Sequence, residues 1–228
     1  MTLQQRASHK YNLEIFQKLS ADATEKVTNT MTERAYETGH TVLFQNDWGQ
    51  SVYFILEGWV KIRMFRSDGH EVTLNILGPD EIVGEMAALD QSPRSTDVIA
   101  LTAIRLGILP REVYIHLLNH EPQFSQNLLI VMSRRLRQAN QRLMVRESNS
   151  ECRLVDALLF IAEGQGRTSR DGVTIPAFPH RELAALSGLA RETVTRILSG
   201  LESRGLIEKA GKQLRFPSLD NLEKLLGL

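Results

Sequence analysis

The chain has one cysteine, Cys152, among its 228 residues. A single thiol excludes an internal disulfide, a zinc site built only from thiolates and a cysteine-held iron–sulfur cluster within one chain. Cys152 opens an apolar helical run, and no motif surrounds it. We therefore interpret it as a structural residue.

Long apolar runs are missing as well. No stretch approaches the roughly 20 apolar residues that a helix needs to cross a bilayer. The N-terminal segment MTLQQRASHK is not followed by the hydrophobic core of a signal peptide. We expect a cytoplasmic protein that has no membrane partner.

Neither sign of charge is in excess. Lysine and arginine total 27, aspartate and glutamate total 27, and the formal net charge is zero. A neutral chain has no overall field that would draw it onto nucleic acid without regard to sequence. A protein that reads one particular site remains compatible with this balance, because a few placed arginines suffice to recognise bases.

The first half of the sequence carries strand signals. From residue 35 to about residue 110, short β-rich runs alternate with glycines, a spacing typical of a small antiparallel barrel or roll. We expect an N-terminal β-roll within residues 1–120. Its expected strands cover residues 41–44, 51–56, 59–66, 71–77, 95–100 and 104–109.

The pattern becomes helical after Pro110. In residues 123–147, apolar positions recur at alternating steps of three and four, a narrow seam that favours a partner helix. We expect residues 121–150 to form a dimerisation helix and hinge in a homodimer. The alternative is packing on the chain's own roll, which we expect for Ile130 and Val131. The seam consists of Leu129, Met132, Leu136, Ala139 and Leu143.

A helix-turn-helix is predicted further along the chain. Residues 182–198 read ELAALSGLARETVTRIL, in which Gly188 supplies the positive φ that the turn needs. Arginine binds the O6 and N7 of guanine, and glutamate accepts from the N4 amine of cytosine. The alternative is an ordinary helical hairpin with a solvated charged face. The second helix offers four polar side chains: Arg191, Glu192, Thr193 and Arg196.

Strand signals return after this segment. Two short runs, residues 206–209 and 213–216, are joined by a turn that contains glycine, which predicts the hairpin of a winged helix. A further helix is expected over residues 151–163 and a surface loop over residues 164–172. The chain should therefore have an α+β fold with an antiparallel β-roll, a long helix and a winged helix-turn-helix in residues 151–228.

A candidate anion site lies between two expected strands, in the segment GEMAALDQSPRST. A short helix begins just after Gly84, so its free backbone N–H groups can hold an anion. Arg94 and Ser95 add donors, and Glu85 adds a carboxylate suited to a sugar hydroxyl. These groups suit a ligand with one phosphate and a ribose. The alternative is a shaped loop in which Arg94 pairs with a nearby carboxylate.

With these motifs, residues 15–216 resemble the cAMP receptor protein and FNR family of bacterial transcription regulators. The glycine–glutamate pair, the short helix and the arginine–serine pair match that family's phosphate-binding cassette. The resemblance implies that adenine lies against the long helix at Asn140, although the chain departs from the family's commoner threonine by carrying Ala139 before it. It implies cAMP as the effector, held by Gly84, Glu85, Met86, Arg94, Ser95 and Asn140.

The resemblance extends to the DNA-binding half. The family's string Arg-Glu-Thr-Val-x-Arg falls on residues 191–196, which implies base reading at TGTGA-like palindromes. The implied partners are a double-stranded DNA operator, RNA polymerase and a second copy of the chain. The implied DNA-binding residues are His180, Arg181, Arg191, Glu192, Thr193 and Arg196.

We expect no catalytic residues, metal or cofactor, because the sequence has no nucleophile with a paired base and no metal cluster. His116 and His120 have the spacing of metal ligands but lie among charged residues typical of a solvated face. Two alternatives remain open. One is the same architecture with no effector or with another small anion such as 2-oxoglutarate, against which the Glu85 carboxylate argues. The other is a cyclic-nucleotide-binding interaction module with no DNA role.

Overall fold

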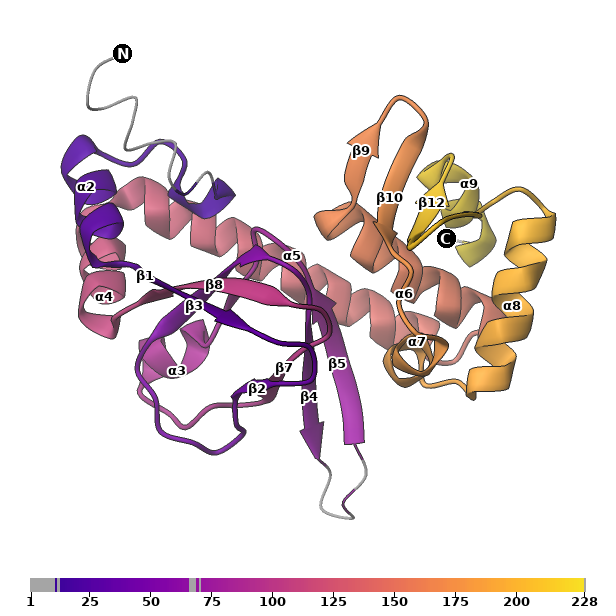
Figure 1. Ribbon diagram of the computed structural model, residues 1–228, viewed down its shortest axis with the longest axis horizontal. Helices are drawn as coiled ribbons and strands as arrows, with labels where there is room; N and C mark the ends of the chain where they lie inside the picture. Colours follow the sequence, from indigo (N-terminus) through magenta and orange to yellow (C-terminus); the bar gives the residue numbers. More distant parts are fainter. Residues whose placement is uncertain (1–10, 12, 66–68, 70, 228) are drawn as a thin grey trace. The chain divides into compact units, whose positions relative to one another are not determined.

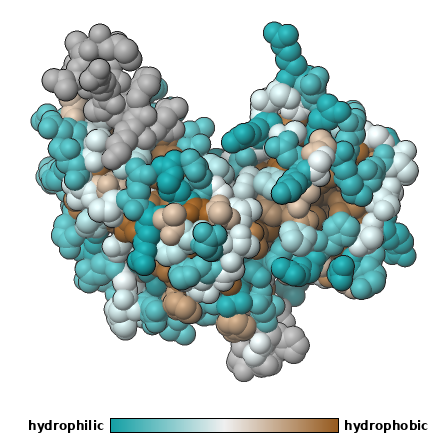
Figure 2. Space-filling view, viewed as in Figure 1, coloured by the Kyte–Doolittle hydropathy of each residue, from teal (hydrophilic) through white to brown (hydrophobic). Residues whose placement is uncertain are grey.

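The computed structural model describes residues 11, 13–65, 69 and 71–227. Contacts divide the chain into two compact units, Met1–Arg134 and Arg135–Leu228. Figure 1 colours the chain from indigo in the first unit to yellow in the second. Polar and charged side chains cover most of the face drawn in Figure 2. Within the described residues, no helix combines the length and apolar character that a membrane span requires.

Two antiparallel sheets of four strands form a β-roll in the first unit. Their strand orders are β1-β8-β3-β6 and β2-β7-β4-β5. The β-roll predicted from short runs separated by glycines is confirmed. The strands are β1 (Thr32–Tyr36), β2 (Thr41–Leu43), β3 (Val52–Glu57), β4 (Val60–Phe65), β5 (Glu71–Leu77), β6 (Ile82–Val83), β7 (Asp97–Ala100) and β8 (Ile104–Leu109).

The two sheets enclose one apolar core. Ile55 of β3 and Leu106 of β8 come from one sheet, Val60 of β4 and Val98 of β7 from the other, and all four are buried in a single cluster. Alternation along each strand places these side chains inward. The core therefore fixes the positions of the strands on either side of the cassette, which lies between β6 and β7.

Helices cover the outer side of the first sheet. Phe54 points away from the inter-sheet core into a second cluster, where its ring centroid lies 4.8 Å from that of Phe16. Tyr114 and Phe124 complete this cluster edge to face, with centroids 5.9 Å apart. The helical elements are η1 (Glu14–Phe16), α2 (Ala21–Thr30), α3 (Glu85–Asp90), α4 (Arg111–His120) and α5 (Pro122–Val145).

The second unit contains a helix-turn-helix and a small sheet of order β11-β12-β10-β9. The predicted helices and the wing hairpin are confirmed. Buried side chains line α6 along most of its length, so it forms the central helix of this unit. The elements are α6 (Ser150–Gln165), β9 (Arg167–Ser169), β10 (Gly172–Pro176), α7 (His180–Ser187), α8 (Arg191–Ser203), β11 (Glu208–Ala210), β12 (Gln213–Phe216), α9 (Leu219–Glu223) and η2 (Lys224–Leu226).

The surface loop expected over residues 164–172 is wrong. The structure places β9 there, paired with β10 in the register Val173↔Thr168. Gly164 still belongs to α6 and Gly166 caps it, while Ser169 and Gly172 belong to the β9–β10 hairpin, in which Gly172 adopts φ 113°. A β-carbon at Gly172 would lie 2.1 Å from the carbonyl oxygen of Phe216, so this glycine permits β10 to lie beside β12.

The expected seam of α5 is exposed in part. Leu129, Leu136 and Leu143 are 66%, 64% and 67% exposed. Ala139 is also exposed, whereas Met132 is half-buried and packs against the second cluster, between the first sheet and the helices. The long helix therefore presents an apolar row that the described residues of one chain leave uncovered.

The expectation for the residues beside this seam is half right. Val131 packs against the second cluster, on the outer side of the first sheet, but Ile130 is exposed. Phe124 and Leu128 are the α5 side chains buried in that cluster. Residues four apart share one face of a helix, so the core-facing row runs through 124 and 128 and leaves position 130 outside it.

Candidate effector site and nucleic-acid interface

The candidate effector site is built around the start of α3. Gly84 leads from β6 into this helix with φ 79°, a conformation that favours glycine. A β-carbon at this position would lie 2.4 Å from Nη1 of Arg94. Gly84 therefore provides both the turn and the space for the arginine side chain.

Arg94 is held at this junction by two carbonyl groups. Its Nη1 donates to the carbonyl oxygen of Gly84 and its Nη2 to that of Ser51, each across 2.7 Å. The residue is only 4% exposed. The alternative of a loop fixed by pairing Arg94 with a carboxylate is not the main arrangement, because both of these hydrogen bonds go to backbone carbonyl groups. A guanidinium has five N–H donors, so some remain for a ligand.

The electrostatic setting of Arg94 is that of a buried cation. Burial lowers its pKa, while the nearby Tyr53 and Glu85 raise it. The guanidinium carbon lies 5.7 Å from the centroid of the Tyr53 ring. Burial also raises the pKa of Tyr53, which Arg94 opposes. The guanidinium stays charged in these surroundings, and it provides a fixed positive charge at the start of α3.

The structure brings part of the predicted cassette together. Glu85 is buried as the first residue of α3 and acts electrostatically on Arg94. Met86 and Ser95 belong to the same segment but have exposed side chains. Asn140 is exposed on the part of α5 that belongs to the second unit. Gly84, Glu85 and Arg94 therefore form the buried centre of the candidate site.

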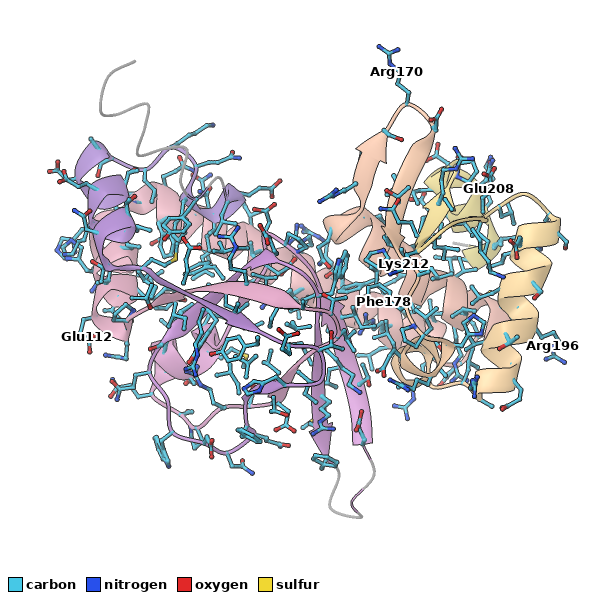
Figure 3. The ribbon with its side chains drawn as sticks, in the orientation of Figure 1. Glu112, Arg170, Phe178, Arg196, Glu208 and Lys212 are labelled. Atoms are coloured by element: carbon cyan, nitrogen blue, oxygen red, sulfur yellow. The ribbon has the colours of Figure 1, made fainter. Side chains whose placement is uncertain are left out.

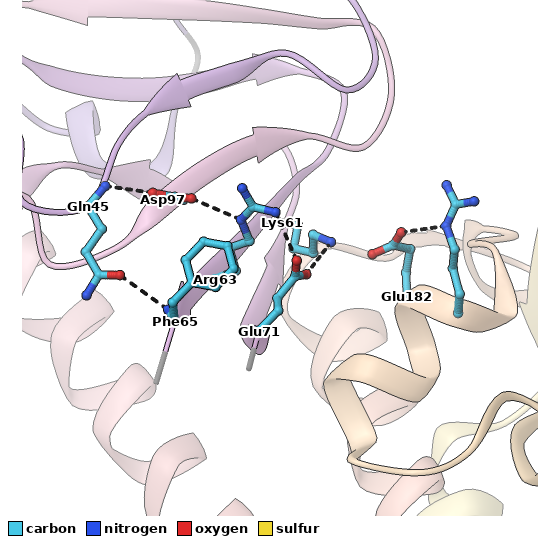
Figure 4. A network of polar contacts seen from close by, with 8 residues as sticks. Gln45, Lys61, Arg63, Phe65, Glu71, Asp97 and Glu182 are labelled. Atoms are coloured by element: carbon cyan, nitrogen blue, oxygen red, sulfur yellow. Dashed lines mark hydrogen bonds and ion pairs between the residues drawn. The ribbon is translucent and has the colours of Figure 1, made fainter. Parts of the chain in front are cut away.

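A polar network fixes the strand that follows the cassette (Figure 4). Asp97 is buried, and its two oxygens accept from the backbone N–H of Gln45 at 2.7 Å and from Nε of Arg63 at 3.0 Å. Arg63 and Lys61 both donate to Glu71. Burial raises the pKa of Glu71, but these two cations outweigh it and the pKa is lowered. The network joins β4, β5 and β7.

The candidate nucleic-acid interface begins at the turn between α7 and α8. Gly188 ends α7 with φ 65°, and the N–H of Leu189 donates to the carbonyl oxygen of Ala184 at 3.0 Å. Val194 is fully buried and fixes α8 against the unit's core. Arg191, Glu192 and Arg196 are exposed, and Thr193 is half-buried. Figure 3 shows Arg196 extending away from α8.

Basic side chains gather at the starts of the two helices. A cavity of about 380 Å³ is lined by Pro179, His180, Arg181 and Arg191. The residues that precede α7 and α8 make no side-chain cap, so both helices begin with free backbone N–H groups. Such N–H groups, together with arginine, favour an anion such as a DNA phosphate.

Two contacts position the basic side chains. Nδ1 of His180 lies 2.7 Å from the hydroxyl of Thr195, which joins the start of α7 to α8. Nε of Arg181 donates to Glu182 across 3.0 Å. The contact of His180 could not be predicted from the motif, because Thr195 occupies the variable position of the Arg-Glu-Thr-Val-x-Arg string.

The structure also bears on the histidine pair of α4. The rings of His116 and His120 stack with centroids 4.3 Å apart, and Nδ1 of His120 lies 3.0 Å from the carbonyl oxygen of His116. Within the described residues, no group of three or more His, Cys, Asp or Glu side chains is arranged to hold a metal ion.

Comparison with known proteins defines the class. Residues 33–121 match the model of the cyclic nucleotide-binding domain, and residues 152–225 match that of the Crp-like helix-turn-helix domain. The chain is therefore a DNA-binding regulator with a domain for a small-molecule effector. It belongs to the CRP/FNR family of transcription regulators, whose members are dimeric and not enzymes.

Individual relatives support this assignment. The "Cyclic AMP receptor protein" of Thermus thermophilus is 35% identical over 85% of this chain and 87% of its own length. The "Global nitrogen regulator" of a Nostoc species is 29% identical over 88% of this chain and 89% of its own. The crystal structure of the Thermus thermophilus catabolite activator protein shares 31% identity with a TM-score of 0.51, covering 94% of this chain and 98% of that one.

Proposed function

We propose that the chain is a homodimeric, cAMP-responsive transcription regulator that binds TGTGA-like palindromes. The observation that carries the effector assignment is the buried Arg94, fixed beside Glu85 at the start of α3. In this proposal residues 1–120 bind the nucleotide, residues 121–150 form the dimerisation helix and hinge, and residues 151–228 bind DNA.

The cassette offers groups that bind the cyclic phosphate and groups that bind the ribose of the nucleotide. Arg94 and Ser95 take the cyclic phosphate, and the backbone N–H groups at Glu85 and Met86 take its remaining oxygens. The Glu85 carboxylate accepts from the ribose 2′-hydroxyl. Asn140 on α5 pairs with the N6 and N7 edge of adenine, as an amide can.

The reading helix accounts for sequence recognition. Arg191 and Arg196 bind guanines of the half-site, and Glu192 accepts from cytosine. Thr193, which lies between Glu192 and Arg196 in the sequence, is also one of the proposed DNA-binding residues. His180 and Arg181 bind phosphates at the cavity described above, which fixes the register without reading sequence.

Dimerisation follows from the apolar row of α5. Leu129, Leu136 and Leu143 are exposed there, and a second copy of the helix would cover them together with Met132 and Ala139. A two-fold dimer would place its two reading helices in successive major grooves of a palindrome. RNA polymerase is the further partner that the family membership supports.

The switch requires different cAMP affinity in two states of the dimer. The nucleotide would join the cassette to α5 through Asn140. It would therefore favour the arrangement of α5 in which the α8 helices of the two subunits match the spacing of successive major grooves. Replacing Asn140 by alanine should reduce the gain in DNA affinity on adding cAMP. An unchanged gain would contradict this route.

A second candidate function keeps the architecture and changes the effector. The similarity to a global nitrogen regulator favours considering another small anion, such as 2-oxoglutarate, or no effector at all. The Glu85 carboxylate beside Arg94 suits a ribose hydroxyl and repels a dicarboxylate. The interaction module without a DNA role is disfavoured by the helix-turn-helix match.

Two measurements separate these candidates. Calorimetry with cAMP, cGMP and 2-oxoglutarate identifies the effector, and we expect saturable binding of cAMP. A gel shift on a TGTGA palindrome, with and without the bound compound, tests the response. Binding of 2-oxoglutarate but not cAMP would select the second candidate, and an absence of any operator shift would contradict sequence-specific DNA binding.

A further inference from the structure

A second cavity lies within the DNA-binding unit, away from the reading helix. It has a volume of about 280 Å³ and is lined by the C-terminal part of α5, by α6 and by the C-terminal helices α9 and η2. Asp156 and Glu163 of α6 and Glu223 of α9 contribute carboxylic groups, and Leu159 and Leu226 contribute apolar surface. None of these residues belongs to the proposed cAMP or DNA sites.

Asp156 is a buried carboxylate on the wall of this cavity. It is 9% exposed, and within the described residues its side chain accepts no hydrogen bond. Burial raises its pKa, and the charge of Arg142 lowers it by a smaller amount. Its oxygens are not fully sealed from solvent, but a carboxylate with so little exposure loses much of its hydration, which is unfavourable without a donor. A ligand that brings N–H donors into the cavity would satisfy it.

Glu163 and Glu223 form an acidic pair beside it, and both residues are exposed. Burial raises the pKa of Glu163, and so do the charges of Glu223 and Asp156 and a side-chain hydrogen bond with Glu223. A cation bound beside the pair would oppose these effects and favour release of the Glu163 proton.

The guanidinium of Arg142 is the cationic group on the cavity wall. Its carbon lies 4.3 Å above the centroid of the Phe160 ring, so it is engaged with that face. Burial lowers its pKa and Asp156 raises it. Lys224, which follows Glu223, donates from Nζ to Asn221 across 3.1 Å. One guanidinium against three carboxylic groups leaves the lining acidic.

We propose that this cavity binds an aliphatic diamine or polyamine. Its ammonium groups donate to Asp156 and to the pair of Glu163 and Glu223, and its methylene chain packs on Leu159 and Leu226. A bare metal ion fits less well, because the described residues contain no metal-holding group of three such side chains. Ammonium groups need no fixed coordination shell.

Such a ligand would join α6 to α9 and to the end of α5. The cavity volume is close to the lower end of the range for small-molecule sites, roughly 300 Å³ upward, which suits a slender chain such as putrescine or spermidine. The ligand would bind beside the connection between α5 and α6. The cavity would then be a second regulatory site, separate from the cassette.

The test is calorimetry of the full chain with putrescine and with spermidine, without DNA or cAMP and at constant ionic strength. We expect saturable binding that weakens at least about tenfold in Glu163→Gln and Asp156→Asn. Glu147→Gln is the matched control, because it removes one carboxylate at an exposed site outside the cavity. Its binding should equal that of the unmodified chain.

Proton release distinguishes the site from general attraction. Titrations in buffers of different ionisation enthalpy should show protons released on binding to the unmodified chain but not to Glu163→Gln. Equal weakening in Glu147→Gln, or full binding by Glu163→Gln, would overturn the proposal. If Asp156→Asn does not fold, Glu163→Gln decides alone, since Glu163 is exposed and its replacement leaves the buried side chains unchanged. Without DNA or cAMP present, the outcome is independent of the proposed function.

Discussion

Arg134 of α5 donates from Nη2 to Oε1 of Glu81 across 2.6 Å, and Glu81 is only 3% exposed. Glu81 directly precedes β6, which leads into Gly84 and the start of α3. Its backbone is also fixed, because its carbonyl oxygen accepts from the N–H of Ile55 at 2.9 Å. The ion pair therefore fastens the long helix to the segment that carries the cassette.

Replacing Arg134 by methionine should destabilise the first unit. The change keeps an apolar stem and leaves the buried Glu81 without this cation. Breaking a fully buried pair costs about 3 to 5 kcal/mol, and we expect about 1 to 3 kcal/mol here because the arginine side chain is one-third exposed. Urea unfolding measures it. In a double-mutant cycle, Glu81→Gln should destabilise the Arg134→Met variant less than it destabilises the unmodified chain. Strictly additive losses of stability would contradict an interaction between the two residues.

Arg94→Gln should abolish most of the effector binding. The amide keeps polarity but loses the positive charge and the fork that the phosphate requires, so we expect cAMP affinity to fall about 10- to 100-fold. Calorimetry measures the affinity, and circular dichroism checks the fold. Lys26→Gln is a control that removes a cation from an exposed site on α2, in the same unit and outside the cassette. Retention of full affinity by Arg94→Gln would exclude this arginine as the phosphate ligand.

The cassette could be predicted from the sequence because its parts are contiguous. Gly84, Glu85 and Arg94 lie within one short segment, and their chemistry is legible from residue type and spacing. The groups that position Arg94 could not be predicted. The carbonyl of Ser51 is 43 positions away along the chain, and it accepts through the backbone, which carries no side-chain signal.

Local pattern also limited the prediction of strands. β5 and β8 were predicted at their observed bounds, because each reads as an apolar alternation between glycine or loop signals. β1 was missed, since its sequence TERAY is largely exposed and polar. It is a strand because it pairs with β8 over five positions, Thr32↔Ile108 to Tyr36↔Ile104. Long-range pairing of this kind overrides local propensity.

Arg196→Ala and Arg181→Ala should differ in their effect on DNA binding. The first removes a proposed base contact and should cost about 1 to 3 kcal/mol on the matched palindrome, with much less loss on random DNA. The second removes a proposed phosphate contact, so it should weaken binding to both DNAs alike. It should also reduce the slope of log affinity against log salt concentration by about 1. Anisotropy titrations at several salt concentrations measure both. Equal losses for Arg196→Ala on both DNAs would refute base reading.

Leu136→Glu should convert the dimer to a monomer. A charge at the centre of the exposed row of α5 would be desolvated in a helix–helix interface, which costs several kcal/mol without a partner. Sedimentation velocity measures the mass in solution. Phe44→Glu makes the same apolar-to-acid change at an exposed site off this helix and should leave the dimer intact. A dimeric Leu136→Glu would place the interface elsewhere.

The pH dependence of stability should change in Glu163→Gln. Because the folded chain holds the Glu163 proton more tightly than the unfolded chain, this group's contribution is fully present below its ordinary pKa of 4.5 and is lost as the pH rises through the raised folded pKa. Glutamine carries no such proton, so the stability of the variant relative to the unmodified chain should increase over that pH window.

Urea midpoints at intervals from about pH 4 to pH 8 measure this difference. Taking the difference between the two proteins removes the opposite contribution of Glu71, whose lowered pKa stabilises the fold as pH rises. Glu147→Gln should give a flat difference, since its carboxylate is exposed outside the cavity. A flat difference for Glu163→Gln as well would contradict a raised pKa of Glu163 in the folded chain, and a bound ammonium would then have no proton to displace there.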